Sequence, residues 1–270
     1  MCAIFGMGLL NNHKLTDNDL LRNMIRSLFM ESKARGRDAS GVVYASSREY
    51  VVLKNDMPAD KFINLSEYDA TEEKYLALTG TKGVEIAKAP PRIVIGHCRA
   101  QTKGSARNNK NNHPIIRDSI IGVHNGVVIN DDIIFNRYTS SFKRNGEVDS
   151  ESIFALIEYY VNKEEKPIHS AVRKMASVTS GSMSCAFVMR HVPYIVCLFK
   201  RTAPCDVLLF EDVGLLMWSS SKDYILDSVK ACDGGKMLGA PKEIDYPRGS
   251  GMCIDLHRNL LNRFIIDNGL

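Results

Sequence analysis

The sequence predicts an α+β fold in which helices cover a core of β-strands. Residues 183–189 and 194–199 are apolar at consecutive positions, which is typical of strands buried on both faces. Residues 17–33 instead carry apolar side chains at helical spacing, which predicts an amphipathic helix packed on that core. The chain has 270 residues, 44% of them hydrophobic, and we expect one domain over 1–270.

In the first half of the chain, strands and helices alternate. An apolar run at 2–10 predicts a buried strand, and Thr16 or Asp17 can cap the helix that follows it. By the same patterns, we expect strands at 42–45, 93–95 and 120–123, and helices at 72–78 and 131–138. The polar segment 55–91 is expected to be an insertion or surface excursion.

The second half begins with helices and becomes rich in strands. A helix opens at 149–152, where apolar residues then recur on one face, and Pro167 suits the first turn of a helix over 167–178. Beyond the two strands already named, short apolar runs predict strands at 207–210, 215–218, 252–256 and 264–266, with a helix at 222–231.

Composition and charge exclude several classes of protein. The net charge of +4 is spread along the chain, so it predicts binding to neither nucleic acid nor a membrane surface. The longest apolar runs are far too short to span a bilayer, and the N-terminus lacks a secretory signal pattern. We therefore expect a cytoplasmic protein.

The cysteines and histidines give no support for a disulfide framework or a metal site. There are seven of each, without a close CxxC pair or an HExxH pattern, so we expect no metal and no cofactor. Five cysteines lie in strand-like apolar surroundings, where cysteine usually packs as a small hydrophobe: Cys98, Cys185, Cys197, Cys205 and Cys253.

Cys2 is the candidate nucleophile, because it directly follows the initiator methionine at the start of the first strand. Methionine is generally removed before a residue as small as cysteine, which would give Cys2 both a thiol and a free α-amino group. An α-amino group titrates at about 7.7 to 8.0, so at neutral pH part of it can accept the thiol proton. The alternative is that Cys2 only begins the strand.

Polar groups follow two of the predicted strands, at 96–104 and at 124–126. Neighbouring strands that each end in such a group would form a polar pocket at one edge of a sheet. Each group also has a simpler explanation, since His-Asn-Gly at 124–126 suits a tight turn and Asp149 suits a helix N-cap.

Several motifs stand in a fixed order along the chain. They are Met-Cys-Ala-Ile-Phe-Gly at 1–6, Arg-Gly-x-Asp-x-x-Gly at 35–41, Gly-His-x-Arg-x-x-Thr-x-Gly at 96–104, His-Pro at 113–114, His-Asn-Gly at 124–126, Asp-Ser-Glu at 149–151 and Ser-Gly-Ser at 180–182. This set closely resembles the class II glutamine amidotransferase domain, the N-terminal nucleophile glutaminase of glucosamine-6-phosphate synthase, amidophosphoribosyltransferase and asparagine synthetase. The resemblance spans essentially the whole chain. It implies a four-layer αββα sandwich of two antiparallel sheets flanked by helices.

The resemblance also implies the chemistry of the site. Cys2 would attack the side-chain amide of L-glutamine and form a thioester, while Asn125 and Gly126 would donate hydrogen bonds to the oxyanion. Arg99 would bind the substrate α-carboxylate, and Asp149 would pair with its α-ammonium group.

The remaining matched positions would support those groups. Thr102 would assist near the carboxylate, Arg35 and Asp38 would hold the turn that carries the nucleophile, and His97 and His124 would be structural. Two positions depart from the family, because Ala100 stands where an aromatic residue is common and Lys103 where several members have histidine or alanine. We expect those departures to change the shape of the substrate pocket and the contacts of the segment that covers it, and to leave the chemistry intact.

No acceptor domain follows the amidotransferase pattern before Leu270, so we expect a stand-alone glutaminase that passes ammonia to a separate synthetase partner. Two alternatives remain open. The chain could be a related hydrolase of a γ-glutamyl or other small amide, or a catalytically silent binding or structural module with the same fold.

Overall fold

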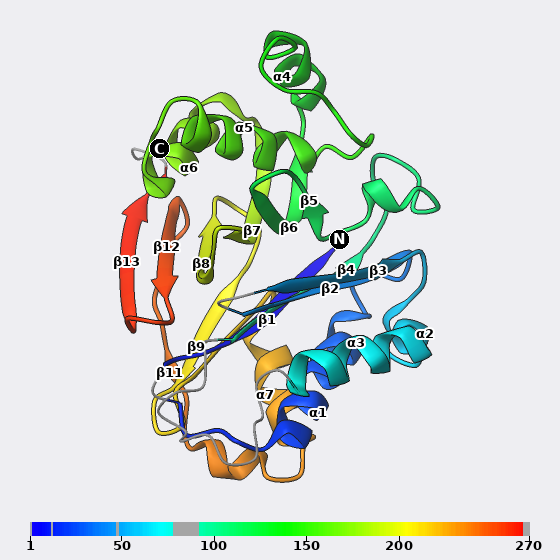
Figure 1. Ribbon diagram of the computed structural model, residues 1–270, viewed down its shortest axis with the longest axis vertical. Helices are drawn as coiled ribbons and strands as arrows, with labels where there is room; N and C mark the ends of the chain where they lie inside the picture. Colours follow the sequence, from blue (N-terminus) through cyan, green and yellow to red (C-terminus); the bar gives the residue numbers. More distant parts are fainter. Residues whose placement is uncertain (1, 12, 47–48, 78–91, 267–270) are drawn as a thin grey trace.

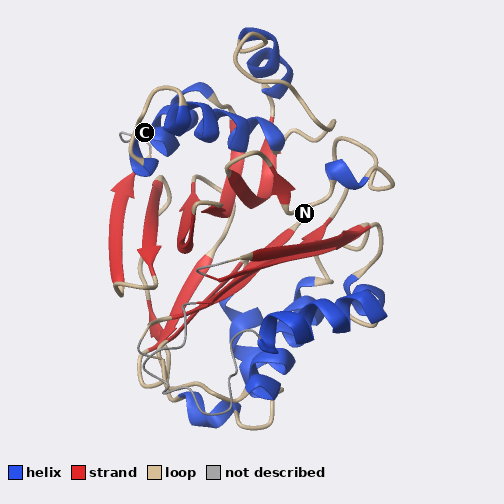
Figure 2. Cartoon of the chain, in the orientation of Figure 1, coloured by secondary structure: helices blue, strands red, loops and turns tan. Residues whose placement is uncertain are grey.

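Two facing β-sheets form the centre of the protein, and helices cover the outer face of each sheet (Figure 1; Figure 2). The computed structural model describes residues 2–11, 13–46, 49–77 and 92–266. The predicted four-layer α+β sandwich of antiparallel sheets is confirmed. No helix among these residues combines the length and the apolar character that crossing a membrane requires.

The first sheet has seven strands in the order β11-β9-β10-β1-β4-β2-β3, and every neighbouring pair is antiparallel. Its strands are β1 (Ala3–Leu9), β2 (Ala39–Ser46), β3 (Tyr50–Asn55), β4 (Arg92–Arg99), β9 (Asp206–Phe210), β10 (Leu215–Ser219) and β11 (Lys242–Glu243). The N-terminal strand β1 therefore lies in the middle of the sheet, where both of its edges are paired.

The second sheet has six strands in the order β13-β12-β8-β7-β6-β5, again antiparallel throughout. Its strands are β5 (Ile115–Ile116), β6 (Ile120–Val128), β7 (Gly181–Met189), β8 (Val192–Lys200), β12 (Ser250–Asp255) and β13 (Leu260–Ile265). The apolar pattern found β7 and β8, whereas the short edge strand β5 carries too few residues to show one.

Helices on the first sheet pack on the face that looks away from the second sheet (Figure 1). They are α1 (Asn18–Ser32), α2 (Ala59–Phe62), α3 (Ser66–Ala77) and α7 (Lys222–Lys230). Asp17 caps α1 as expected, because its side chain accepts a hydrogen bond from Leu20 N at 2.9 Å. Phe62 and Tyr68 are fully buried in this layer, so residues 55–77 contribute to the core, while 78–91 lie outside the described residues.

On the other side, α5 (Glu151–Asn162) and α6 (Ile168–Val178) cover the second sheet, and α4 (Asp131–Arg137) projects beyond it (Figure 2). The predicted helix at 149–152 begins later than the N-cap interpretation of Asp149 required. Ser150 occupies the N-cap position, without a capping hydrogen bond from its side chain. The interpretation of Asp149 as an N-cap is therefore wrong.

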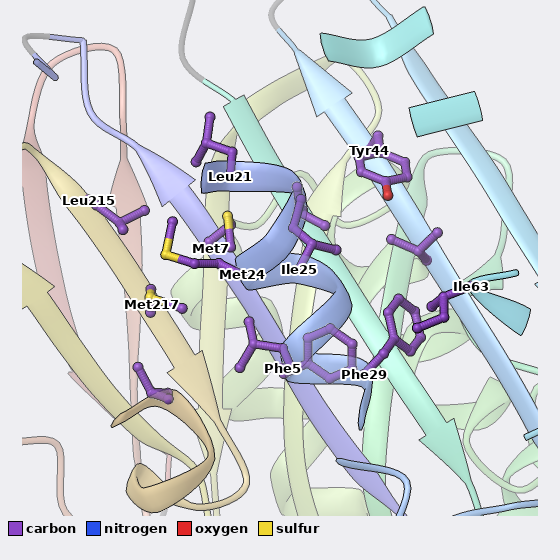
Figure 3. Packing of buried hydrophobic residues seen from close by; sticks show 14 of the residues in the cluster. Phe5, Met7, Leu21, Met24, Ile25, Phe29, Tyr44, Ile63, Leu215 and Met217 are labelled. Carbon is purple, nitrogen blue, oxygen red and sulfur yellow. The ribbon is translucent and has the colours of Figure 1, made fainter. Parts of the chain in front are cut away.

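Apolar side chains fill three layers: beneath α1, between the sheets, and beneath α5 and α6. Figure 3 shows the first layer, where Phe5 of β1 meets Phe29 of α1, with ring centroids 4.7 Å apart. Phe5 also pairs in register with Gly96 of β4, and a Cβ at Gly96 would lie 2.2 Å from the Phe5 ring. The glycine therefore lets the tip of the Phe5 ring approach the backbone of β4 closely.

Two further expectations from the sequence need correction. The groups at 96–104 and 124–126 do not follow strands of one sheet, because β4 continues to Arg99 and β6 continues through Gly126 to Val128 in the facing sheet. Cys197 and Cys253 are not free packing residues, since they oppose each other on β8 and β12 and form a disulfide. Sequence spacing could not reveal that pairing, because 56 residues separate the two cysteines.

Candidate active site

Cys2 lies just before β1, beside the end of β4. Its Sγ atom is 3.3 Å from both the carbonyl oxygen and the amide nitrogen of Ala100, so the thiol can donate to the first and accept from the second. Arg35 Nε donates to Cys2 O at 3.0 Å. Burial raises the pKa of the Cys2 thiol, while the Ala100 N–H and the Arg99 charge lower it and the Asp149 charge raises it. Met1 lies outside the described residues.

Arg99 ends β4 and is only 2% exposed. Its Nη1 atom donates to Asn112 Oδ1 at 2.7 Å, and its Nη2 atom donates to the carbonyls of Lys103 and Gly104 at 2.8 and 2.7 Å. These three bonds leave two of the five guanidinium N–H groups without an acceptor among the described residues. Burial lowers the Arg99 pKa, and negative charge at Cys2 and Asp149 raises it.

Asp149 is also 2% exposed, and its carboxylate is only half satisfied. Oδ2 accepts a hydrogen bond from Val128 N at 2.6 Å, which fixes the carboxylate against the end of β6. Within the described part of the chain, no donor reaches Oδ1. Oδ1 is therefore the oxygen of this carboxylate that is left to accept a hydrogen bond from a bound molecule.

Asn125 and Gly126 belong to β6, and Asn125 connects the two sheets. Its Nδ2 atom donates to Ser220 Oγ at 3.4 Å, and the same Oγ accepts from Ile4 N at 2.9 Å. Gly126 has a φ of 144°, and a Cβ there would lie 2.0 Å from the carbonyl oxygen of Ser182. Glycine is therefore required at 126 both by the backbone conformation and by the close approach of β7.

The turn before β2 supports the end of β4. Asp38 Oδ2 accepts from Gln101 N at 2.7 Å, and Asp38 N donates to Arg99 O at 3.0 Å. Arg35 thus holds the backbone of Cys2, and Asp38 holds the loop after Arg99. Thr102 lies exposed in that loop.

Three buried histidines lie between the strands that carry these groups. His97 stacks on His113 with ring centroids 4.1 Å apart, and its Nε2 atom is 3.1 Å from His124 O. His124 Nδ1 is 2.8 Å from Ser150 Oγ. Burial lowers the pKa of all three, that of His97 to about 3, so the rings are neutral near pH 7. Over the residues that the structure describes, none of them hydrogen-bonds to Cys2.

Sequence reasoning missed three residues that organise the site: Ser220, Asn112 and Lys54. Asn112 is fully buried and accepts from Arg99, and Lys54 Nζ donates to the carbonyls of Asn112 and Pro114 at 2.8 and 2.9 Å. Burial lowers the pKa of Lys54 to about 8. The run of asparagines at 108–112 was visible in the sequence, but nothing local shows that one of them meets Arg99.

Comparison with known proteins identifies relatives but no matching family model. The chain is 27% identical over 176 residues to the isomerizing glutamine–fructose-6-phosphate aminotransferase of Buchnera aphidicola subsp. Baizongia pistaciae, covering 63% of this chain and 25% of that protein. It is 25% identical over 217 residues to the enzyme of that name from Streptococcus pneumoniae serotype 4, covering 80% and 31% respectively. The chain thus spans less than a third of the length of these relatives.

Two solved structures share the fold over the whole of this chain and half of theirs, each at 13% sequence identity. One is the glutamine phosphoribosylpyrophosphate amidotransferase of B. subtilis complexed with ADP and GMP, with a TM-score of 0.64. The other is described as the allosteric regulatory enzyme of purine biosynthesis, with a TM-score of 0.68. Sequence relatives and fold together support a class II glutamine amidotransferase domain of the N-terminal nucleophile type. Within that class, both sequence relatives named above are glutamine–fructose-6-phosphate aminotransferases.

Proposed function

We propose that this chain hydrolyses the side-chain amide of free L-glutamine to glutamate and ammonia through a thioester on Cys2. One observation carries the proposal. The Cys2 thiol lies close enough to the charges of Arg99 and Asp149 for both to shift its pKa. Two N–H groups of Arg99 and one oxygen of Asp149 have no hydrogen-bond partner among the described residues. Glutamine offers the three complementary groups, an amide carbon, an α-carboxylate and an α-ammonium.

The reaction begins when Cys2 Sγ attacks the amide carbon. Because burial raises the thiol pKa, the sulfur is protonated near pH 7 and needs a base, for which we propose its own α-amine after removal of Met1. Asn125 Nδ2 and the Gly126 N–H would stabilise the oxyanion. The C–N bond then breaks, the proton passes from the amine to the departing nitrogen, and ammonia leaves. Water hydrolyses the thioester and releases glutamate.

Arg99 and Asp149 would restrict the reaction to a free amino acid. The two remaining N–H groups of Arg99 would bind the α-carboxylate, and Asp149 Oδ1 would accept from the α-ammonium group. Glutamine inside a peptide has neither charge. A γ-glutamyl amide would satisfy both residues as well as glutamine does, so it remains the second candidate substrate.

The ammonia would pass to an acceptor protein, which we propose to be a separate synthetase. Free ammonia is mostly protonated at neutral pH and then no longer nucleophilic, so the transfer would have to be enclosed. Exposed apolar side chains gather where the chain leaves β6 and enters α4. Val127, Ile129 and Ile133 are 41%, 76% and 68% exposed. Val127 directly follows Gly126, and Ile129 and Ile133 come shortly after it in the chain, so a protein bound there would lie beside the site. Replacing Ile129 and Ile133 by serine would weaken binding of the acceptor and leave glutaminase turnover unchanged.

The decisive experiment treats native protein with a diazo-ketone analogue of glutamine and locates the adduct by mass spectrometry. We expect one adduct on Cys2 in a chain that has lost Met1, no adduct in Cys2→Ala, and protection by L-glutamine. Glutaminase assays with glutamine and γ-glutamyl amides separate the two substrates. Labelling that persists in Cys2→Ala, or native protein that still begins with methionine, refutes the mechanism. Native protein that loses Met1 but neither reacts nor turns over would indicate the silent module instead.

A further inference from the structure

The loop that follows β4, residues 100–106, encloses Arg99 on one side and contacts helix α4 on the other. On the inner side, the carbonyls of Lys103 and Gly104 accept hydrogen bonds from Arg99 Nη2. On the outer side, Lys103 Nζ lies 2.7 Å from Asp131 Oδ2 and 2.8 Å from Asp132 Oδ2. One residue therefore joins the Arg99 guanidinium, through its own backbone, to the first residues of α4.

We propose that Lys103 is a positioning residue for substrate binding. Its ion pairs with Asp131 and Asp132 hold the loop so that the Lys103 carbonyl orients Arg99 toward the α-carboxylate of glutamine. These three residues are called the loop anchor below. The inference rests on the glutaminase function proposed above, and it adds a determinant of substrate affinity that does not touch the substrate.

Burial makes the loop anchor stronger than an ordinary surface ion pair. The Asp131 side chain is 4% exposed, whereas those of Lys103 and Asp132 are 38% and 66% exposed. Burial lowers the pKa of Lys103, but hydrogen bonds to the two aspartates outweigh it and leave the pKa above its ordinary value. The ammonium group is therefore charged at physiological pH. Solvent and salt reach the Asp132 half of the pair and weaken it.

The position of α4 explains why this contact matters for the whole site. Helix α4 follows closely on β6, the strand that carries Asn125 and Gly126. The loop anchor thus connects the loop that orients Arg99 with the strand that carries the proposed oxyanion donors. Loosening it would disturb ground-state binding of glutamine more than the chemical step, because the thiol and the β6 backbone keep their own contacts.

Arg144 offers a matched control, because it pairs with the same two carboxylates from the segment between α4 and α5. Its Nη1 atom lies 2.5 Å from Asp132 Oδ1, and its Nη2 atom contacts Asp131 Oδ2. Its other hydrogen bond among the described residues goes to Glu147 O, not to the loop. Removing either cation leaves the other to neutralise buried Asp131, so neither variant leaves that charge unpaired. Of the two substitutions, only the one at Lys103 removes a contact between the loop and α4; the hydrogen bond from Gln101 N to Asp38 remains.

The kinetic test compares Lys103→Met, Lys103→Arg and Arg144→Met with wild type. We expect Lys103→Met to raise KM for glutamine on the order of five-fold with little change in kcat. In Lys103→Arg, which keeps the positive charge, KM should stay close to the wild-type value. Arg144→Met should stay within about two-fold of wild type. Added salt should raise the wild-type KM toward that of Lys103→Met, whereas the KM of Lys103→Met should change little with salt. Equal effects of the two methionine variants would overturn the inference.

A second measurement does not depend on activity. Hydrogen–deuterium exchange of peptides covering residues 100–106 should be faster in Lys103→Met than in wild type, and unchanged in Arg144→Met. Unchanged exchange in Lys103→Met would overturn the loop anchor. Absence of glutaminase activity in wild type would refute the proposed function instead, and the exchange comparison would still decide whether Lys103 holds the loop.

Discussion

Asp149→Asn is the most informative single substitution, because asparagine has nearly the same shape but no charge. The side-chain carbonyl of asparagine can still accept the 2.6 Å hydrogen bond from Val128 N, so the fold around β6 should survive. What is lost is the anionic oxygen that no described donor satisfies. A hydrogen bond to a charged partner contributes about 1.5 to 3 kcal/mol, which corresponds to roughly a 10- to 150-fold loss of kcat/KM for glutamine.

The assay for this variant uses two substrates that differ only in the α-amino group. Glutaramate lacks that group, so its slower turnover should be the same in Asp149→Asn as in wild type, while turnover of glutamine falls. The substitution should therefore remove most of the discrimination between the two. An equal loss on both substrates would show that Asp149 acts on the fold or the nucleophile rather than on the ammonium group.

The same variant predicts a change at the thiol with a definite sign. The Asp149 charge raises the pKa of Cys2, so its removal should lower that pKa and move the pH profile of thiol alkylation toward lower pH. At a fixed pH below the thiol pKa, iodoacetamide should react faster with Asp149→Asn than with wild type. Slower or equal reaction would contradict the placement of this carboxylate beside Cys2.

Three further predictions follow from the strands around the site. Asn125→Ala should lower kcat by roughly 10²- to 10³-fold with little change in KM, measured by glutamate release, and a change confined to KM would count against an oxyanion role. Gly126→Ala should destabilise the fold by at least about 1 to 3 kcal/mol in urea unfolding, because the new Cβ would meet Ser182 O in a backbone conformation that alanine avoids; unchanged stability would contradict this geometry. His97 has a pKa of about 3 in the folded protein and near 6.5 in the unfolded chain. Between these two pH values, unfolding therefore takes up a proton at His97. The contribution of His97 to stability should be constant above about pH 6.5 and should fall as the pH drops toward 3, so the loss of stability over that range should be smaller in His97→Asn.

The sequence determined much of the local structure and pointed to the class of protein. Apolar periodicity located α1 and its Asp17 cap, because the pattern and the capping hydrogen bond are local. It also located most of the strands, although not the full lengths of β4 and β6, because polar residues interrupt the apolar run before each strand ends. The order of the short motifs pointed to the amidotransferase class, because each motif resembles that class at a candidate site residue or beside one.

Only the tertiary structure decided which groups meet. The pairing of Cys197 with Cys253, the contact of Arg99 with Asn112 and the link from Asn125 through Ser220 to β1 all join residues that sequence patterns treat separately. The tertiary structure also decided that β4 and β6 lie in two facing sheets rather than ending at one edge of a single sheet. Such contacts depend on strand order and register, which are set by long-range burial of apolar faces rather than by neighbouring residues. The sequence therefore supplied the candidate groups, and the packing of the two sheets determined what surrounds each of them.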